Sequence, residues 1–215
     1  AEGLGFGQGY VEVRASGLAG PLKARLVVDA EGASRSLLRR LGAAKGGGYF
    51  LGAQYEVSGA ELEDPGRVEV YLGREYAPGF FAWIIPLEGG RARVGLCVRG
   101  GLAEAPPRAY LDRFIKRHPV ASRKLRGARV EASSGGAIPA DGPIRCYGHR
   151  LLVVGYAAGH VKPTTGGGVY VGMKAARAAA EVAAECAEAD RFDAKALSKY
   201  ARRVRKEIGA ELAFT

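Results

Sequence analysis

An apolar run that leads through small residues into a helical pattern occurs near the start of the chain. Residues Leu22–Ala30 read LKARLVVDA, and the apolar end of this run predicts a strand with Asp29 at its carboxyl end. A helix is predicted over Ser34–Leu41, with Ser34 as its N-cap and Gly42 closing it. Strands this apolar are typical of buried parallel sheets, and ligands bind at the carboxyl ends of such strands.

The same order of elements returns later in the chain. Leu151–Gly155 (LLVVG) predicts a second buried strand, Tyr156–Gly168 a loop, and Val169–Ala187 a long alanine-rich helix. A last helix is predicted over Ala194–Leu212, where apolar residues recur at helical spacing between basic ones. The chain therefore contains two strand, loop and helix units of one kind.

The region between these units has a different pattern, with short runs of β-type residues separated by Gly, Pro and Asp. We expect an antiparallel sheet there, followed by a helix over Pro107–Arg117 and a strand over Ala128–Ile138. The fold class is thus α+β, with a partial cofactor-binding α/β region in residues 1–45, an antiparallel-sheet domain in 46–137, and a return to the cofactor-binding region with the last helices in 138–215. The predicted strands of the sheet are Phe50–Val57, Arg67–Leu72, Phe81–Pro86 and Arg91–Val98.

Composition narrows the class of protein. The chain has 215 residues, of which 47% are hydrophobic and 25% charged, so it can bury a core like a soluble globular protein. No apolar run approaches the roughly 20 residues of a membrane-spanning helix, and residues 1–10 lack the layout of a secretory signal, so we expect a cytoplasmic protein. Cys97, Cys146 and Cys186 are far apart and no histidines cluster near them, so we expect buried thiols and no metal site.

The net charge of +10 allows several kinds of partner. The densest basic stretch, Arg108–Arg129, contains a single acid, Asp112, and is interpreted as a solvated surface. Nucleic-acid binding would need stacking aromatics or a recognition helix beside it, and the nearby Tyr110 and Phe114 are expected in the core, so we expect no nucleic-acid partner. An anionic membrane surface is the alternative, because each exposed Lys or Arg gains about 1 kcal/mol near such a surface.

The loop before the long alanine-rich helix has the composition of a site for a flat ligand. It contains small residues, a proline turn and three consecutive glycines, so its backbone can approach a ligand closely. Amides at a helix N-terminus carry partial positive charge, so Thr165, Gly166, Gly167 and Gly168 are predicted to face an anionic centre. The three histidines of the chain suggest no catalytic role, and the catalytic residues are left unknown.

These segments resemble known flavoprotein motifs. VVDAEGASRSLLRR (residues 27–40) and LLVVGYAAGHVKPTTGGGVYVG (residues 151–172) are similar to the DG-type and GD-type motifs of flavoproteins related to aromatic hydroxylases. PTTGGG and YAPGFFAWIIP are similar to segments of the geranylgeranyl reductase family of FAD-dependent oxidoreductases, in particular to digeranylgeranylglycerophospholipid reductases. The resemblance runs from about residue 22 to the end of the chain.

The resemblance implies FAD as cofactor and a prenyl lipid as substrate. The residues implied near the cofactor pyrophosphate are Asp29, Glu31, Gly32 and Arg35. Those implied along the ribityl chain are Gly155, Tyr156, Ala157, Ala158 and Gly159, and those implied at the isoalloxazine are Thr165, Gly166, Gly167 and Gly168. Those implied beside the isoprenoid chain are Pro78, Gly79, Phe80, Phe81 and Trp83, for which the alternative is an ordinary aromatic core strand.

Three features depart from the family pattern. The Gly-x-Gly-x-x-Gly turn that binds the ADP pyrophosphate is missing, and Gly3–Gly9 cannot replace it because no strand precedes it, so we expect the chain alone not to bind FAD stably. Tyr156 stands where the family has an aspartate, and we expect its ring to fill part of the cofactor cleft instead of hydrogen-bonding through its hydroxyl. Further C-terminal helices of the family are also missing, so both ends are interpreted as truncated.

Two functional hypotheses remain open at this point. The first is an FAD-dependent oxidoreductase, or part of one, that reduces carbon–carbon double bonds of geranylgeranyl or other prenyl lipids of the archaeal type, with possible peripheral membrane binding. The second is a non-catalytic remnant, or one subunit of a split flavoprotein that needs a partner chain to supply the ADP-binding segment. The first is the leading hypothesis, and the missing motif and Tyr156 are the two features that favour the second.

Overall fold

The computed structural model describes residues 1–44 and 48–213 and divides into two compact units. One unit combines Ala1–Gly47 with Pro139–Thr215, and the other spans Gly48–Ile138. The predicted domain boundary between residues 45 and 46 lies outside the described residues. The assignment of the parts to cofactor and substrate stays a prediction.

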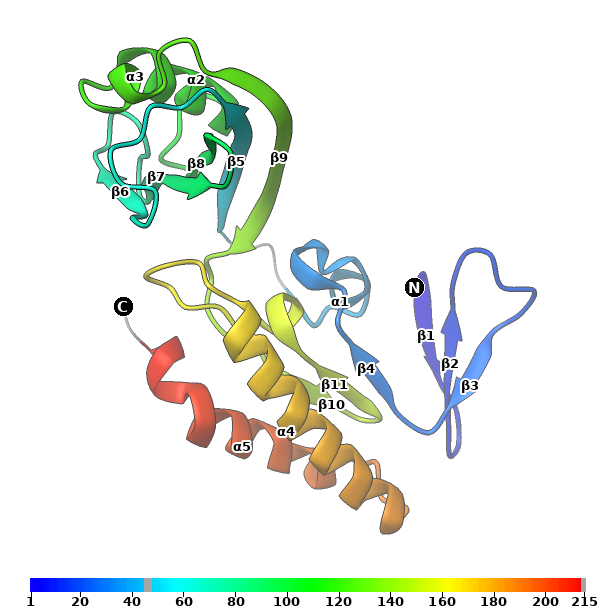
Figure 1. Ribbon diagram of the computed structural model, residues 1–215. Helices are drawn as coiled ribbons and strands as arrows, with labels where there is room; N and C mark the ends of the chain where they lie inside the picture. Colours follow the sequence, from blue (N-terminus) through cyan, green and yellow to red (C-terminus); the bar gives the residue numbers. More distant parts are fainter. Residues whose placement is uncertain (45–47, 214–215) are drawn as a thin grey trace. The chain divides into compact units, whose positions relative to one another are not determined.

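The middle unit is built on a five-stranded sheet (Figure 1). Strand β8 pairs antiparallel with both β5 and β7, and β6 pairs antiparallel with β7. The predicted antiparallel sheet is therefore confirmed, with strand ends shifted by one or two residues. The pairing of β5, β7 and β8 extends one residue beyond the predicted runs, whereas β6 begins two residues later than predicted. The strands lie in the order β6-β7-β8-β5-β9 and comprise β5 (Tyr49–Ser58), β6 (Glu69–Leu72), β7 (Phe81–Leu87), β8 (Arg91–Arg99) and β9 (Arg129–Pro139).

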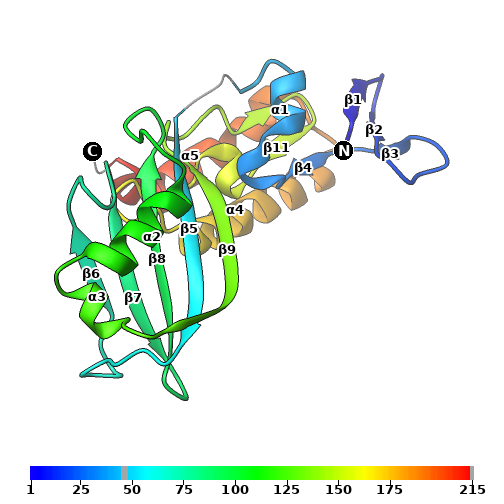
Figure 2. The ribbon, with the colours of Figure 1, turned by 90° about the horizontal axis from the view of Figure 1, so that it is seen from above.

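Helices α2 (Pro107–Arg117) and α3 (Ala121–Lys124) cover one face of this sheet (Figure 2). Tyr110, Leu111 and Phe114 point from α2 into the core, as their helical spacing predicts. They meet sheet residues that recur with period two along their strands, so one face of the sheet is buried under α2. These buried sheet residues are Tyr55, Val57, Ala82, Ile84, Val94, Leu96 and Val98.

The other unit contains a small mixed sheet in the order β10-β11-β4. Strand β4 (Val27–Asp29) lies parallel to β11 (Leu151–Val153), with Val153 paired to Asp29, and β10 (Tyr147–Gly148) adds to β11 in the antiparallel sense. Because β4 and β11 run in the same direction, the turns that follow them leave the sheet at one edge. The two predicted strand, loop and helix units therefore meet in space.

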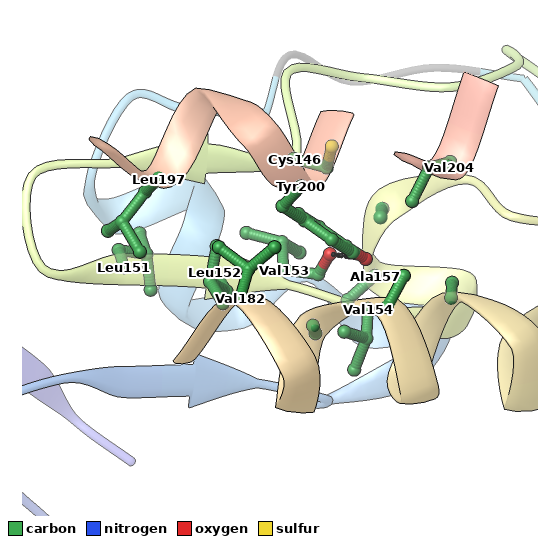
Figure 3. Packing of buried hydrophobic residues seen from close by; sticks show 14 of the residues in the cluster. Cys146, Leu151, Leu152, Val153, Val154, Ala157, Val182, Leu197, Tyr200 and Val204 are labelled. Carbon is green, nitrogen blue, oxygen red and sulfur yellow. Dashed lines mark hydrogen bonds between the residues drawn. The ribbon is translucent and has the colours of Figure 1, made fainter. Parts of the chain in front are cut away.

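Two long helices, α4 (Val169–Glu188) and α5 (Ala194–Leu212), pack against each other and complete this unit. Asp193 caps α5 by accepting a hydrogen bond from the amide of Ala196 (3.0 Å). The apolar stripe of α5 is buried in one core with β11 and the inner face of α4 (Figure 3). It consists of Leu197, Tyr200, Val204 and Ile208.

The prediction of one strand over Leu22–Ala30 is wrong. The structure divides this run into β3 (Leu22–Ala24) and β4, which belong to different sheets. The chain changes sheets next to Arg25, whose guanidinium donates to the carbonyl of Ala187 (3.0 Å) and to the carboxylate of Asp190 (2.8 Å) at the end of α4. These partners are too distant in sequence for a local pattern to indicate the break.

The glycine-rich start of the chain forms a hairpin. Strands β1 (Gly3–Phe6) and β2 (Val11–Arg14) pair antiparallel, and β3 continues the sheet in the order β1-β2-β3. No helix follows β1 directly, so the glycines of residues 3–9 serve a strand and a turn. They do not form the strand, turn and helix arrangement that binds a dinucleotide.

We expect Tyr200→Phe to lower the free energy of unfolding by about 1–2 kcal/mol, because a buried carbonyl loses its donor. The Tyr200 hydroxyl donates to the Val153 carbonyl (2.9 Å) in a fully buried site at the centre of the core (Figure 3). Urea unfolding would measure the change as a lower midpoint at constant slope. Tyr170→Phe is the matched control, because Tyr170 is half exposed and its loss of a hydroxyl should change the midpoint little. Equal midpoints for the two variants would contradict this assignment.

Candidate functional site

Asp29 lies at the carboxyl end of β4 and is almost completely buried. Its Oδ1 accepts a hydrogen bond from the amide of Glu31 (2.9 Å), and within the described residues no donor reaches its Oδ2. Burial raises the pKa of Asp29, and the amide of Glu31 opposes this effect. A buried carboxylate oxygen without a donor is a feature that a polar ligand can satisfy.

Glu31 has a structural task that the sequence did not indicate. Its carboxylate accepts hydrogen bonds from the amides of Leu37 (2.8 Å) and Leu38 (3.0 Å) and so caps helix α1 (Ser36–Arg40). The prediction of a helix over Ser34–Leu41 capped by Ser34 is therefore wrong at its start. The Ser34 hydroxyl donates to the Glu31 carbonyl (3.2 Å), within a short 3-10 turn that precedes α1.

Arg35 joins the turn after β4 to the turn after β11. Its side chain is 1% exposed, Nη1 donates to the carboxylate of Asp141 (2.8 Å), and Nη2 donates to the carbonyl of Tyr156 (3.3 Å). Its backbone lies in the left-handed region (φ 46°), which is strained for a residue with a side chain. The sequence did not indicate that Asp141 pairs with Arg35, because an aspartate before Gly and Pro is typical of an ordinary turn.

The turn after β11 begins as a 3-10 helix, η2 (Gly155–Ala158), where the sequence predicted an open loop. Gly155 (φ 63°) and Gly159 (φ 74°) adopt left-handed conformations that favour glycine. A Cβ on Gly159 would lie 2.1 Å from the carbonyl oxygen of Gly142, so the absence of a side chain lets the turn pack against that segment. Ala157 and Ala158 are fully buried, which leaves the backbone as the part of η2 available to a ligand.

Tyr156 packs against the glycine-rich loop that precedes α4. Its hydroxyl donates a hydrogen bond to the carbonyl of Gly166 (2.7 Å). The prediction that Tyr156 would not hydrogen-bond through its hydroxyl is therefore wrong. A Cβ built on Gly168 would lie 1.9 Å from the Tyr156 ring, which closes that side of Gly168 to any ligand. Tyr156 thus covers Gly168 with its ring and holds Gly166 through its hydroxyl, and Gly167 is the exposed glycine of the three.

The loop itself is held by its own backbone. The Lys162 amide donates to the Gly167 carbonyl (2.9 Å), and the Gly166 amide donates to the Lys162 carbonyl (2.9 Å). The Thr165 hydroxyl oxygen accepts from the Gly167 amide (3.3 Å). Thr165 and Gly167 are exposed, so this part of the loop presents backbone to solvent immediately before the start of α4.

The residues implied for the prenyl substrate lie in the middle unit. Phe81 and Trp83 alternate along β7 with the buried Ala82, so their side chains point to the sheet face opposite the one covered by α2. Phe80 stacks on Phe81 with ring centroids 4.4 Å apart and also contacts Phe50 at 4.7 Å. These aromatic rings form a second apolar surface, separate from the core under α2.

Neighbouring small residues shape this aromatic surface. The Trp83 indole lies across Gly95, where a Cβ would come within 2.5 Å of the ring, and its Nε1 donates to the Gln54 side chain (3.1 Å). Pro78 is buried, and Gly79 adopts a left-handed conformation (φ 76°) against the Arg99 side chain. The sequence did not indicate the Trp83–Gly95 contact, which is a cross-strand pair set by register.

The remaining candidate groups give no separate chemistry. All three cysteines are buried thiols as predicted, and burial raises the pKa of Cys97 and Cys146 to about 11. His160 lies in the loop after η2 and is buried, and burial lowers its pKa to about 4. Within residues 1–44 and 48–213, no cluster of His, Cys, Asp and Glu could hold a metal ion, and no helix is long and apolar enough to cross a membrane.

Solved structures define the class of the fold. The chain is similar to a geranylgeranyl bacteriochlorophyll reductase-like protein from Thermoplasma acidophilum, with a TM-score of 0.83 and 24% identity over 95% of this chain and 52% of that chain. It is also similar to the myxobacterial chondrochloren halogenase, an FAD-dependent halogenase, with a TM-score of 0.70 and 20% identity over 99% of this chain and 52% of that chain. The molecule therefore has the α+β fold of flavoproteins of the aromatic-hydroxylase type, as predicted.

Sequence comparison gives the family. The model of the geranylgeranyl reductase catalytic domain matches residues 49–136. Digeranylgeranylglycerophospholipid reductase 2 of Methanothermobacter thermautotrophicus is 40% identical over 192 residues, covering 87% of this chain and 48% of that protein. A digeranylgeranylglycerophospholipid reductase of Methanocaldococcus jannaschii is 40% identical over 152 residues, covering 70% of this chain and 38% of that protein. The chain belongs to the geranylgeranyl reductase family and spans about half the length, or less, of these relatives.

We expect Gly168→Ala to destabilise the protein by about 1–3 kcal/mol, because the new methyl group overlaps the Tyr156 ring. Tyr156→Ala removes the obstacle, so adding Gly168→Ala to that variant should cost less than it does in the wild type. A double-mutant cycle in urea measures the difference, for which we expect about 1 kcal/mol of coupling. Strictly additive effects would contradict the contact.

We expect Glu31→Gln to lose about 1 kcal/mol of stability at neutral pH, because the charged cap of α1 is gone. Burial alone would raise the pKa of Glu31, but the amides of Leu37 and Leu38 lower it below its ordinary value. A depressed folded-state pKa stabilises the protein above the unfolded value of about 4.3, and this stabilisation is lost as pH falls further. The gap between wild type and variant should therefore narrow below that pH in urea titrations.

The matched control for this titration is Glu188→Gln, at the exposed C-terminal end of α4. Its stability should follow the wild-type curve at every pH. A constant gap between wild type and Glu31→Gln across the acid range would show that the Glu31 carboxylate does not act as the cap.

Proposed function

We propose that this chain forms part of a flavoprotein that reduces carbon–carbon double bonds of geranylgeranyl or other prenyl lipids. The observation that carries the proposal is the meeting of the two flavoprotein motifs at one sheet edge, where Arg35 joins Asp141 to the Tyr156 turn. Membership in the geranylgeranyl reductase family supports the substrate class, because two of its relatives carry the name of a digeranylgeranylglycerophospholipid reductase.

The residues of the sheet edge fit FAD in part. Asp29 Oδ2 is buried without a donor and Arg35 Nε is buried without an acceptor among the described residues, so both suit a polar ligand at the turn after β4. Thr165 and Gly167 present exposed loop backbone near the N-terminus of α4, where the helix dipole favours negative charge. Gly168 fits least, because the Tyr156 ring covers it. When bound, reduced FAD would supply the hydride for the reduction.

The aromatic surface of the middle unit suits a prenyl chain. Phe50, Phe80, Phe81 and Trp83 gather on the sheet face that α2 leaves open, and their rings offer a broad apolar area for an isoprenoid tail. Their role would be to bind and orient the tail and to keep water away from the double bond. The net charge of +10 favours anionic lipid head groups and peripheral contact with an anionic membrane.

A second candidate function rests on Tyr156. This residue stands at the position where the family resemblance implies an aspartate, and its ring fills space beside Gly168. A non-catalytic homologue, or a subunit whose flavin site is completed by a partner chain, would tolerate such a replacement. In that case flavin binding would require the partner chain and would be weak or undetectable without it.

If the chain binds FAD without a partner, the spectrum of added FAD shifts to that of bound flavin. In that case we expect Gly167→Val to lower the affinity at least about tenfold, because its branched side chain obstructs the exposed backbone of the loop. An added Cβ on Gly167 meets only the Thr165 hydroxyl (3.3 Å), so the fold should tolerate the change. Gly20→Val is the matched control, because an added Cβ on Gly20 meets no atom within 4 Å and the residue lies outside the proposed site.

Either result decides between the two candidate functions. Binding that Gly167→Val weakens and Gly20→Val leaves intact would be followed by incubation with dithionite and a geranylgeranyl lipid, with hydrogenated product detected by mass spectrometry. An unshifted flavin spectrum would exclude autonomous catalysis and favour the second candidate, which a partner chain that restores binding would then establish.

A further inference from the structure

A cavity of about 510 Å³ lies in the first unit, between α5 and the segment that leads into β10. Its most deeply buried lining residues are Cys146, Val204 and His160, and its walls include Ile144 and Leu212. Cys146 and Val204 also belong to the core drawn in Figure 3. None of the residues proposed for FAD or for the prenyl chain lines this cavity, so it is a separate site.

The cavity walls carry charge of one sign. Arg145 and Arg205 line it, and among the described residues that line it there is no Asp or Glu. Both arginines are exposed, and the Arg145 guanidinium lies over the Tyr147 ring at 5.0 Å, which holds it in place. Neither has an ion-pair partner within the described part of the chain.

The floor is apolar and has one neutral polar group. His160 is 1% exposed, and within the described residues its Nδ1 has no hydrogen-bond partner. Burial lowers its pKa to about 4, so the imidazole is uncharged at neutral pH. An apolar group can therefore be buried at the floor beside the neutral imidazole, the valine and the thiol. A charged head group would find no counter-ion there.

We propose that this cavity binds an anionic amphiphile, with its alkyl or prenyl tail in the cavity and its carboxylate or phosphate head at Arg145 and Arg205. The volume lies within the range of small-molecule sites, which are apolar clefts with few polar groups that fix orientation. A guanidinium can donate two parallel hydrogen bonds to the oxygens of a planar carboxylate or of a tetrahedral phosphate, so it suits both head groups. The described residues of the lining include no Phe, Tyr or Trp ring on which a nucleotide base would stack.

The helix dipole fixes which end of the cavity takes the head group. Gly209, Leu212 and Ala213 lie at the C-terminal end of α5, where unpaired carbonyls repel an anion. Arg205 lies one turn further back and Arg145 is on the facing segment. The tail therefore lies toward the end of α5, and the anion stays with the arginines.

The test measures binding of dodecanoate and of dodecyl phosphate to the whole chain by calorimetry, below their micelle concentrations and without flavin. Dodecanol and dodecyltrimethylammonium are the uncharged and cationic probes. Gly209→Leu fills the cavity, since a Cβ on Gly209 makes only ordinary contact with the Arg205 stem (3.4 Å) and leucine favours a helix more than glycine does. Arg145→Gln and Arg205→Gln remove the charges, and Arg202→Gln is the control on an exposed position of α5 outside the cavity.

We expect one anion to bind per chain, Gly209→Leu to abolish binding, and each cavity arginine variant to weaken it about fivefold, with Arg202→Gln unchanged. Dodecanol should bind more weakly and the cation not at all. Tighter binding of dodecyl phosphate than of dodecanoate would indicate a phospholipid-like or prenyl-phosphate ligand. Tighter binding of dodecanoate would indicate a fatty acid.

Three results would overturn the inference. The first is that neither anion binds. The second is that the Gly209→Leu variant binds the anions as tightly as the wild type does. The third is that the cationic probe binds as tightly as the anions do, which would indicate nonspecific adsorption. Analytical ultracentrifugation adds a fourth, since self-association that Gly209→Leu abolishes would show that a second copy occupies the cavity. The outcome is independent of the proposed reductase function, because no flavin takes part in the experiment.

Discussion

Arg35 carries a positive charge that is almost completely removed from water, and the arrangement of both flavoprotein turns depends on how that charge is balanced. Burying an unpaired ion costs several kcal/mol, and a left-handed backbone at a residue with a side chain adds about 1–3 kcal/mol of strain. The Asp141 carboxylate and the Tyr156 carbonyl compensate by accepting hydrogen bonds from the two terminal nitrogens. Three segments that are distant in sequence are thereby held at one edge of the parallel strand pair.

The packing around this contact also depends on glycines, because a side chain at two of these positions would overlap a neighbouring segment. Gly159 lets η2 approach Gly142, and Gly168 gives the Tyr156 ring the space to lie against the loop. The Tyr156 hydroxyl then fixes that loop through the Gly166 carbonyl. The same tyrosine therefore orders the backbone proposed to meet the flavin and restricts the space in which the flavin would lie.

Alternation along the strands of the middle unit places the core on one face of the sheet and the aromatic surface on the other. Residues such as Ile84 and Leu96 point toward α2 and form the core, while Phe81 and Trp83 on the same hairpin point to the opposite face. Gly95 allows the indole to lie flat across the neighbouring strand. A single-residue change of register would exchange these two faces, so the antiparallel pairing of β7 with β8 decides both the core and the aromatic surface.

The sequence by itself determined the fold class, the antiparallel sheet, the two long helices and the family, because periodicity and the glycine motifs are local properties of the chain. It also identified Asp29, Gly155 and the loop around Gly167 as neighbours of strand ends. Only the tertiary structure decided that the run Leu22–Ala30 breaks at Arg25, that Glu31 caps α1, and that Tyr156 bonds to Gly166. Each of these depends on partners that folding brings together from other segments or on an unusual backbone angle, which periodicity does not encode.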